Sequence, residues 1–96
     1  MAFSGEGLLT GAQVRAARAL LRWSAEELAE SARLGVATIR RAELQDGPVT
    51  STAANVRAIR SALEHAGLEF IPENGGGAGV RFRQRHSMIK QNSDSL

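Results

Sequence analysis

Two adjacent arginines, Arg40 and Arg41, stand inside the helix-like stretch GVATIRRAE at residues 35–43. An arginine guanidinium carries a permanent charge and a planar fork of N–H donors, which suits two-point contacts with a phosphate or with the edge of guanine. Eleven of the twelve basic residues in the chain are arginine. The formal net charge is only +2, so the composition permits a nucleic-acid ligand without requiring one.

Side chains suited to covalent or metal chemistry are sparse. The chain has no cysteine, which removes both a disulfide framework and a thiolate zinc site. His65 and His86 are far apart in the sequence and have no cysteine or paired carboxylate at ligand spacing, so we expect no metal site and no cofactor. The adjacent Glu26 and Glu27 are explained as favourable charge in the first turn of a helix. No nucleophile stands beside a base, so we expect no catalytic residue and no enzyme.

The chain length of 96 residues fits one small domain with one modest core. Residues 1–9 show no periodic pattern and lack the features of a signal peptide, so we expect a frayed lead-in there. No stretch approaches the roughly 18 apolar residues of a membrane span. We therefore expect a cytoplasmic protein with no membrane partner.

Apolar residues recur at helical spacing in four segments. Thr10 can cap a helix whose apolar positions include Val14 and Leu21. Ser24 and Glu27 have the spacing of a capping box and so begin a second helix. We expect helices over residues 10–23, 24–31, 36–45 and 51–66.

After Gly67 the period of the pattern changes from about 3.6 to about 2 residues. Residues 68–71 and 80–83 alternate apolar and charged side chains around the loop sequence PENGGGAG, which predicts a β-hairpin. An isolated hairpin is marginally stable in water, so its apolar residues must pack on the helices or against a second chain. These apolar residues are Leu68, Phe70, Val80 and Phe82. Across the hairpin, Glu69 can face Arg81 and Arg83.

The stretch QVRAARALLRWSAEELAESARLGVATIRRAE, residues 13–43, resembles the Xre-type, lambda-repressor-like family of helix-turn-helix DNA-binding regulators. The resemblance rests on the motif S-x-E-E-L-A followed at fixed spacing by A-T-I-R-R-x-E. It implies a mainly α fold with a four-helix, lambda-repressor-like helix-turn-helix domain over residues 10–67. A β-hairpin over 68–83 and a disordered, basic and polar tail over 84–96 complete the expected organisation.

The resemblance implies that residues 36–45 form a recognition helix in the major groove of double-stranded DNA. Since Ile39 and Ala42 point into the core, the base-reading candidates lie on the exposed side of this helix and its flanks. They are Val36, Ala37, Thr38, Arg40 and Arg41. The helix begins on apolar residues where the family commonly has polar ones, so hydrogen bonding to bases falls mainly on the arginines.

Backbone contacts are expected around this helix. The phosphate-contact candidates are Ser24, Ala25, Arg33, Thr50, Ser51 and Asn55, although Thr50 or Ser51 can instead cap the last helix. The resemblance also implies an ion pair between Arg18 and Glu43 that ties the first helix to the third. Trp23, between two helices, is interpreted as a core or hinge residue rather than as a base-stacking one.

One recognition helix reads only a few base pairs, so we expect a homodimer on an inverted repeat with half-site centres about 34 Å or a multiple apart. The hairpin is the expected dimer element, because an exposed strand edge invites pairing. Its contacting residues are Phe70, Ile71, Val80 and Phe82. Two alternatives stay open: an antitoxin that binds a protein partner through the hairpin or tail, and a protein-interaction module that has lost specific DNA binding. Bound to DNA, the protein is expected on the bacterial nucleoid.

Overall fold

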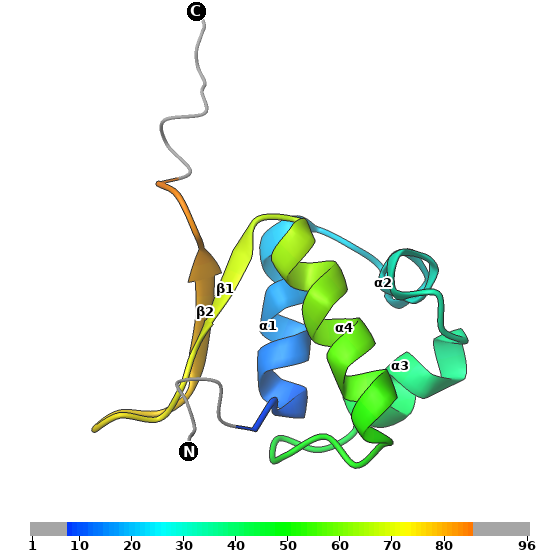
Figure 1. The fold of residues 1–96 in the computed structure, drawn as a ribbon, viewed down its shortest axis with the longest axis horizontal. Coiled ribbons are helices and arrows are strands. Elements are labelled where there is room, and N and C mark those ends of the chain that lie inside the picture. The colour runs from blue at the N-terminus through cyan, green and yellow to red at the C-terminus, as the bar shows by residue number, and fades with distance from the viewer. Residues whose placement is uncertain (1–7, 86–96) are drawn as a thin grey trace, which may run out of the picture.

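A computed structural model describes residues 8–85 of the chain. Four helices are followed by one antiparallel hairpin (Figure 1). The elements are α1 (Gly11–Leu21), α2 (Ala25–Ala32), α3 (Val36–Ala42), α4 (Ala53–His65), β1 (Leu68–Ile71) and β2 (Gly79–Phe82). Residues 1–7 lie outside the described residues, as do residues 86–96, which include His86 and most of the expected tail.

Capping side chains fix where the first two helices begin. The Thr10 hydroxyl accepts the backbone N–H of Gln13, and the Gln13 side chain in turn accepts the N–H of Thr10. Ser24 and Glu27 make the same reciprocal pair at α2, with distances of 3.0 and 2.7 Å. The expected N-cap at Thr10 and the expected capping box at Ser24 are both confirmed.

The third helix is shorter than expected, because it ends at Ala42 rather than at residue 45. The segment after it bonds with the chain that precedes α1. The N–H of Gly11 donates to the carbonyl of Gly47 at 2.9 Å, and the N–H of Val49 donates to the carbonyl of Leu9 at 2.9 Å. The carbonyls of Glu43 and Gln45 also accept from Arg15 Nη1, so the chain after Ala42 is held beside α1 and does not continue as a helix.

Other boundaries differ from the sequence prediction by a few residues. The first helix ends at Leu21, where Arg22 adopts a left-handed conformation with φ of 59°. Neither Thr50 nor Ser51 caps α4, because the Thr52 hydroxyl accepts the first-turn N–H of Asn55 at 3.1 Å. The assignment of all nine first residues to a frayed lead-in is wrong for Leu9, which is 2% exposed in the core.

The hairpin and the pair α2 and α3 lie on opposite sides of α1 and α4 (Figure 1). α2 contacts both α3 and α4, whereas β2 contacts α1 and β1 contacts α4. The fully buried centre of the core is formed by Val14, Leu28, Ile39, Ile59, Leu63 and Leu68. None of the helices among residues 8–85 is both long enough and apolar enough to cross a membrane.

The two strands pair with Leu68 opposite Phe82 and Phe70 opposite Val80. These four side chains pack against the helices, as expected from their alternation. The second strand begins at Gly79, one residue before its expected start. Arg81 pairs with Glu69 at 2.6 Å, but Arg83 does not. The Arg83 side chain instead donates to backbone carbonyls at the end of α4 and in β1. Arg81 lies directly opposite Glu69, whereas Arg83 follows two residues later and faces a different part of the chain.

Gln13 connects α1 to the loop end of the hairpin. Its side chain is 5% exposed, and its amide nitrogen donates to the carbonyl of Gly79 at 2.8 Å and to that of Ile71 at 3.4 Å. Its amide oxygen accepts the N–H of Thr10. One buried amide therefore satisfies polar groups from the helix start and from both strands, which holds the hairpin on the helices.

Candidate nucleic-acid interface

α3 buries one face and presents another to solvent. Ile39 and Ala42 are 0% and 1% exposed, and the helix packs on α2 through this face. Ala37 and Arg41 are four residues apart, so they lie together on the opposite face, and both are exposed. No carboxylate within residues 8–85 makes an ion pair with the Arg41 guanidinium. Arg41 is therefore available to an external ligand.

The two adjacent arginines have different surroundings. Arg40 lies at the edge of the exposed face, and its Nη2 donates to Oε2 of Glu26 on α2 at 2.5 Å. Both side chains remain largely in solvent, at 59% and 63% exposure. The sequence gives no reason to distinguish the two arginines. In the structure Arg40 pairs with Glu26, whereas Arg41 has no carboxylate partner among the described residues.

The remaining base-reading candidates differ in how far they reach into solvent. Val36 and Thr38 are half-buried, and Val36 packs against the core. Gly35 caps the helix without a side-chain bond. Leu44, just beyond the end of α3, is 80% exposed and was not singled out from the sequence. The sequence predicts a helix through residue 45, whereas the shorter α3 leaves Leu44 in the exposed turn that follows it.

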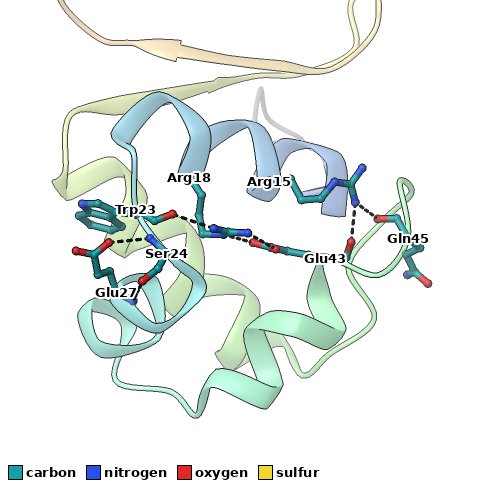
Figure 2. Close-up of polar contacts among 7 residues, drawn as sticks. All are labelled: Arg15, Arg18, Trp23, Ser24, Glu27, Glu43 and Gln45. Atoms are coloured by element: carbon teal, nitrogen blue, oxygen red, sulfur yellow. Dashed lines mark hydrogen bonds and ion pairs between the residues drawn. The ribbon is translucent and has the colours of Figure 1, made fainter.

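Arg18 and Glu43 form the expected ion pair, drawn in Figure 2. Arg18 Nε donates to Glu43 Oε2 at 2.7 Å, and Nη2 donates to Oε1 at 2.9 Å. A third bond runs from Nη1 to the carbonyl of Trp23 at 2.8 Å. The Glu43 and Arg18 side chains are 9% and 24% exposed. One guanidinium thus joins α1, the turn before α2 and the end of α3.

The pair also stabilises the charge on Arg18. The hydrogen bond to Glu43 raises the pKa of Arg18, with further contributions from the charges of Glu43 and Glu26, although partial burial acts in the opposite direction. The guanidinium is therefore charged wherever the protein is folded at ordinary pH.

Sequence reasoning missed a second clamp on α3, made by Arg15. Its Nη1 donates to the carbonyl of Glu43 at 2.6 Å and to that of Gln45 at 3.3 Å (Figure 2). Its other terminal nitrogen pairs with the carboxylate of Asp46. The signal was the placement of Arg15 three residues before Arg18, which puts both on one side of α1. Together the two arginines hold the C-terminal end of α3 by its carbonyls and its carboxylate.

Around the start of α2, part of the expected phosphate-contact set is already engaged. The Ser24 hydroxyl and backbone N–H both bond with Glu27. Ala25 is buried as a side chain, so only its backbone N–H can meet a ligand. Arg33 is exposed and ends α2 in a left-handed conformation with φ of 60°, where glycine is the more favourable residue. This conformation places the Arg33 residue in the turn between α2 and α3.

The start of α4 contributes a group of hydroxyl and amide side chains. Thr50 and Ser51 are exposed, and Asn55 Nδ2 donates to the Ser51 hydroxyl at 3.0 Å. The first backbone N–H groups of α4 have no acceptor within the helix, and that of Asn55 donates to the Thr52 hydroxyl. Thr50 and Ser51 lie between α3 and α4, and Asn55 lies in the first turn of α4, so the expected phosphate-contact residues come both before and after α3 in the chain.

The residues expected at a dimer interface divide between the two faces of the hairpin. Phe70, Val80 and Phe82 are partly buried against the core of their own chain, and the Arg60 guanidinium lies 5.2 Å from the centre of the Phe70 ring. Ile71 lies at the strand position that alternates with Phe70 and so belongs to the face that carries Glu69 and Arg81. The outer face is therefore mostly charged.

Within the part of the chain that the structure describes, no group of three or more His, Cys, Asp or Glu side chains is placed to hold a metal ion. No protein-family model and no curated protein matches the chain. The geometry of α3 and the residues around it therefore carries the functional argument.

Proposed function

We propose that this protein is a sequence-specific DNA-binding transcriptional regulator, with a lambda-repressor-like helix-turn-helix formed by α2 and α3. One observation carries the proposal: Arg41, which has no ion-pair partner within residues 8–85, stands on the exposed face of a helix that Arg18 and Arg15 fix from behind. A short helix held at its end and exposed on one side can enter a major groove without losing its position on the domain.

In this arrangement α3 lies in the major groove and Arg41 reads bases. Its guanidinium donates two hydrogen bonds to O6 and N7 of guanine, which discriminates against other bases by about 1–3 kcal/mol. The Ala37 methyl group, one turn away, contacts the methyl group of thymine. Val36 and Thr38 border this pair and extend the contact along the groove, whereas Arg40 is held at the edge of this face by Glu26. The expected site is a short G-containing core with neighbouring T positions.

Phosphates on either side of the groove orient the domain. The backbone N–H of Ala25 lies at the start of α2, where the helix dipole favours an anion. Arg33, in the turn between α2 and α3, places a positive charge near the phosphates of the same DNA strand. Ser51 and Asn55 approach the phosphates on the other side from the start of α4. Contacts of this kind position a protein on DNA and carry no sequence information themselves.

We further propose that the regulator acts as a homodimer through its hairpin. In the described residues the sheet has only two strands, so the outer edge of β2 has no strand partner. Antiparallel pairing with a second β2 would satisfy this edge and bring Ile71 of each copy close to the interface. Light scattering at tens of micromolar tests this, and a monomer both with and without DNA would contradict it.

Selection from a duplex library with a randomised centre tests the proposed function. We expect enrichment of one inverted repeat whose half-sites contain guanine, because two copies of Arg41 would read it. Failure to enrich any sequence, while the protein stays folded by circular dichroism, would contradict specific DNA binding. That result would favour the alternative of a protein-interaction module on the same fold.

A further inference from the structure

Glu26 is the only carboxylate that contacts the exposed side of α3 among the described residues. It belongs to the first turn of α2, and its Oε2 accepts from Nη2 of Arg40 at 2.5 Å. Its charge also acts on Arg18, behind the same helix. This carboxylate thus stands at the boundary between α2 and α3, where the proposed function places DNA.

Stability accounts for the position of Glu26 only in small part, because a carboxylate in the first turn of a helix contributes about 0.3–1 kcal/mol. Both members of the pair are more than half exposed, and pairs of this kind contribute about 0–1 kcal/mol to folding. The helix start is already stabilised by Glu27 through the capping box. A second carboxylate at this position also repels any phosphate that approaches the amides of α2. It therefore weakens the phosphate attraction that a DNA-binding surface would otherwise gain.

We propose that Glu26 determines specificity by occupying Arg40, so that Arg40 does not bind DNA phosphates non-selectively. This inference rests on the proposed function. Non-specific affinity comes almost entirely from contacts between basic groups and phosphates. With Arg40 held by Glu26, that part of the affinity is smaller, whereas base reading by Arg41 is unaffected. The ratio of selective to non-selective binding therefore rises.

The test compares Glu26→Gln with Glu30→Gln, a substitution that removes the same charge from the same helix. Glu30 is exposed and makes no ion pair among the described residues, so its variant controls for the change in net charge. Fluorescence anisotropy would measure binding to the duplex enriched from the library and to a scrambled duplex, across about 50 to 200 mM salt, the range in which counterion release is most readily resolved.

For Glu26→Gln we expect several-fold tighter binding to the scrambled duplex and little change on the enriched one. The salt dependence on the scrambled duplex should steepen by about 0.9 in log–log slope, the value for one added phosphate contact. Glu30→Gln should change the slope by much less. Equal effects of the two variants on slope and selectivity would overturn the inference.

Combining Glu26→Gln with Arg40→Gln shows whether Glu26 acts through Arg40. We expect most of the tighter non-selective binding to disappear in the Arg40→Gln background, leaving only the small part that comes from direct repulsion by Glu26. If it persists there undiminished, Glu26 acts by direct repulsion alone and the inference is wrong. Wild-type protein that does not distinguish the two duplexes would contradict the proposed function itself, whereas a selective wild type with an unaltered Glu26→Gln variant would contradict this inference alone.

Discussion

Arg18 and Glu43 face each other as a forked guanidinium and a carboxylate, with two parallel hydrogen bonds of 2.7 and 2.9 Å between α1 and the end of α3. The carboxylate is nearly buried, and the guanidinium has one more bond to the Trp23 carbonyl. The orientation of α3 therefore depends on a residue of α1 that lies 25 positions earlier in the chain.

Substitution of Glu43 by glutamine should destabilise the fold strongly. The amide cannot accept both guanidinium bonds, and it leaves the Arg18 charge without its counter-charge in a partly buried site. The expected loss is about 3–5 kcal/mol in the free energy of unfolding, the range for breaking a buried pair. Urea titration followed by circular dichroism measures it.

The double substitution Arg18→Met with Glu43→Leu is the control, because it removes both charges together. It should be less destabilising than Glu43→Gln alone. A Glu43→Gln variant within about 1 kcal/mol of the wild type, as for an exposed pair, would show that the pair does not fix α3.

Gly11→Ala should also destabilise the protein, although alanine favours helices. A Cβ at residue 11 would lie 2.0 Å from the carbonyl oxygen of Gln45 and 2.7 Å from that of Ala42. Both are backbone atoms and cannot move away as a side chain can. We expect a loss of about 1–3 kcal/mol in thermal or urea unfolding, typical of overpacking.

Gly76→Ala is the matched control for Gly11→Ala. A Cβ at residue 76 meets no atom within 4 Å. Its variant should unfold within about 0.5 kcal/mol of the wild type, as for other surface substitutions. Equal stability of the two variants would mean that α1 and the segment after α3 are not in close contact.

Gln13→Ala should loosen the hairpin. The substitution leaves the Gly79 carbonyl and the Thr10 N–H without their partner, and a buried unsatisfied group costs about 1–3 kcal/mol. Compared with the wild type, the Gln13→Ala variant should show faster amide hydrogen exchange in β1 and β2 but not in α2 and α3. Gln84→Ala, at an exposed position, is the control, and unchanged hairpin protection in Gln13→Ala would contradict this role.

The local elements were predictable from the sequence because their signals are local. Capping residues and apolar spacing specify the starts of α1 and α2, and the change of period at Gly67 specifies the hairpin. The Arg18–Glu43 pair was predictable only through the family resemblance, since no local pattern joins residues 25 positions apart.

The features that the sequence did not indicate depend on long-range contacts. The early end of α3 depends on contacts of the following segment with α1 and the chain before it, made by the Arg15 side chain and by backbone bonds. The roles of Arg15 and Gln13 depend on which carbonyls the fold brings beside them. The difference between Arg40 and Arg41 likewise depends on the approach of Glu26 from α2, so neither propensity nor periodicity could reveal it.

The measurement that tests the central proposal most directly is fluorescence anisotropy with the library-enriched duplex and a scrambled duplex, using the wild type, Arg41→Ala and Arg85→Ala. Arg85 is exposed and follows β2, a strand that lies across the molecule from α3 (Figure 1), and its variant controls for the lost charge. We expect Arg41→Ala to lose about 1–3 kcal/mol of preference for the enriched duplex, while Arg85→Ala keeps it. Equal, salt-sensitive weakening on both duplexes by the two variants would contradict base reading by α3 and leave only general attraction to phosphate.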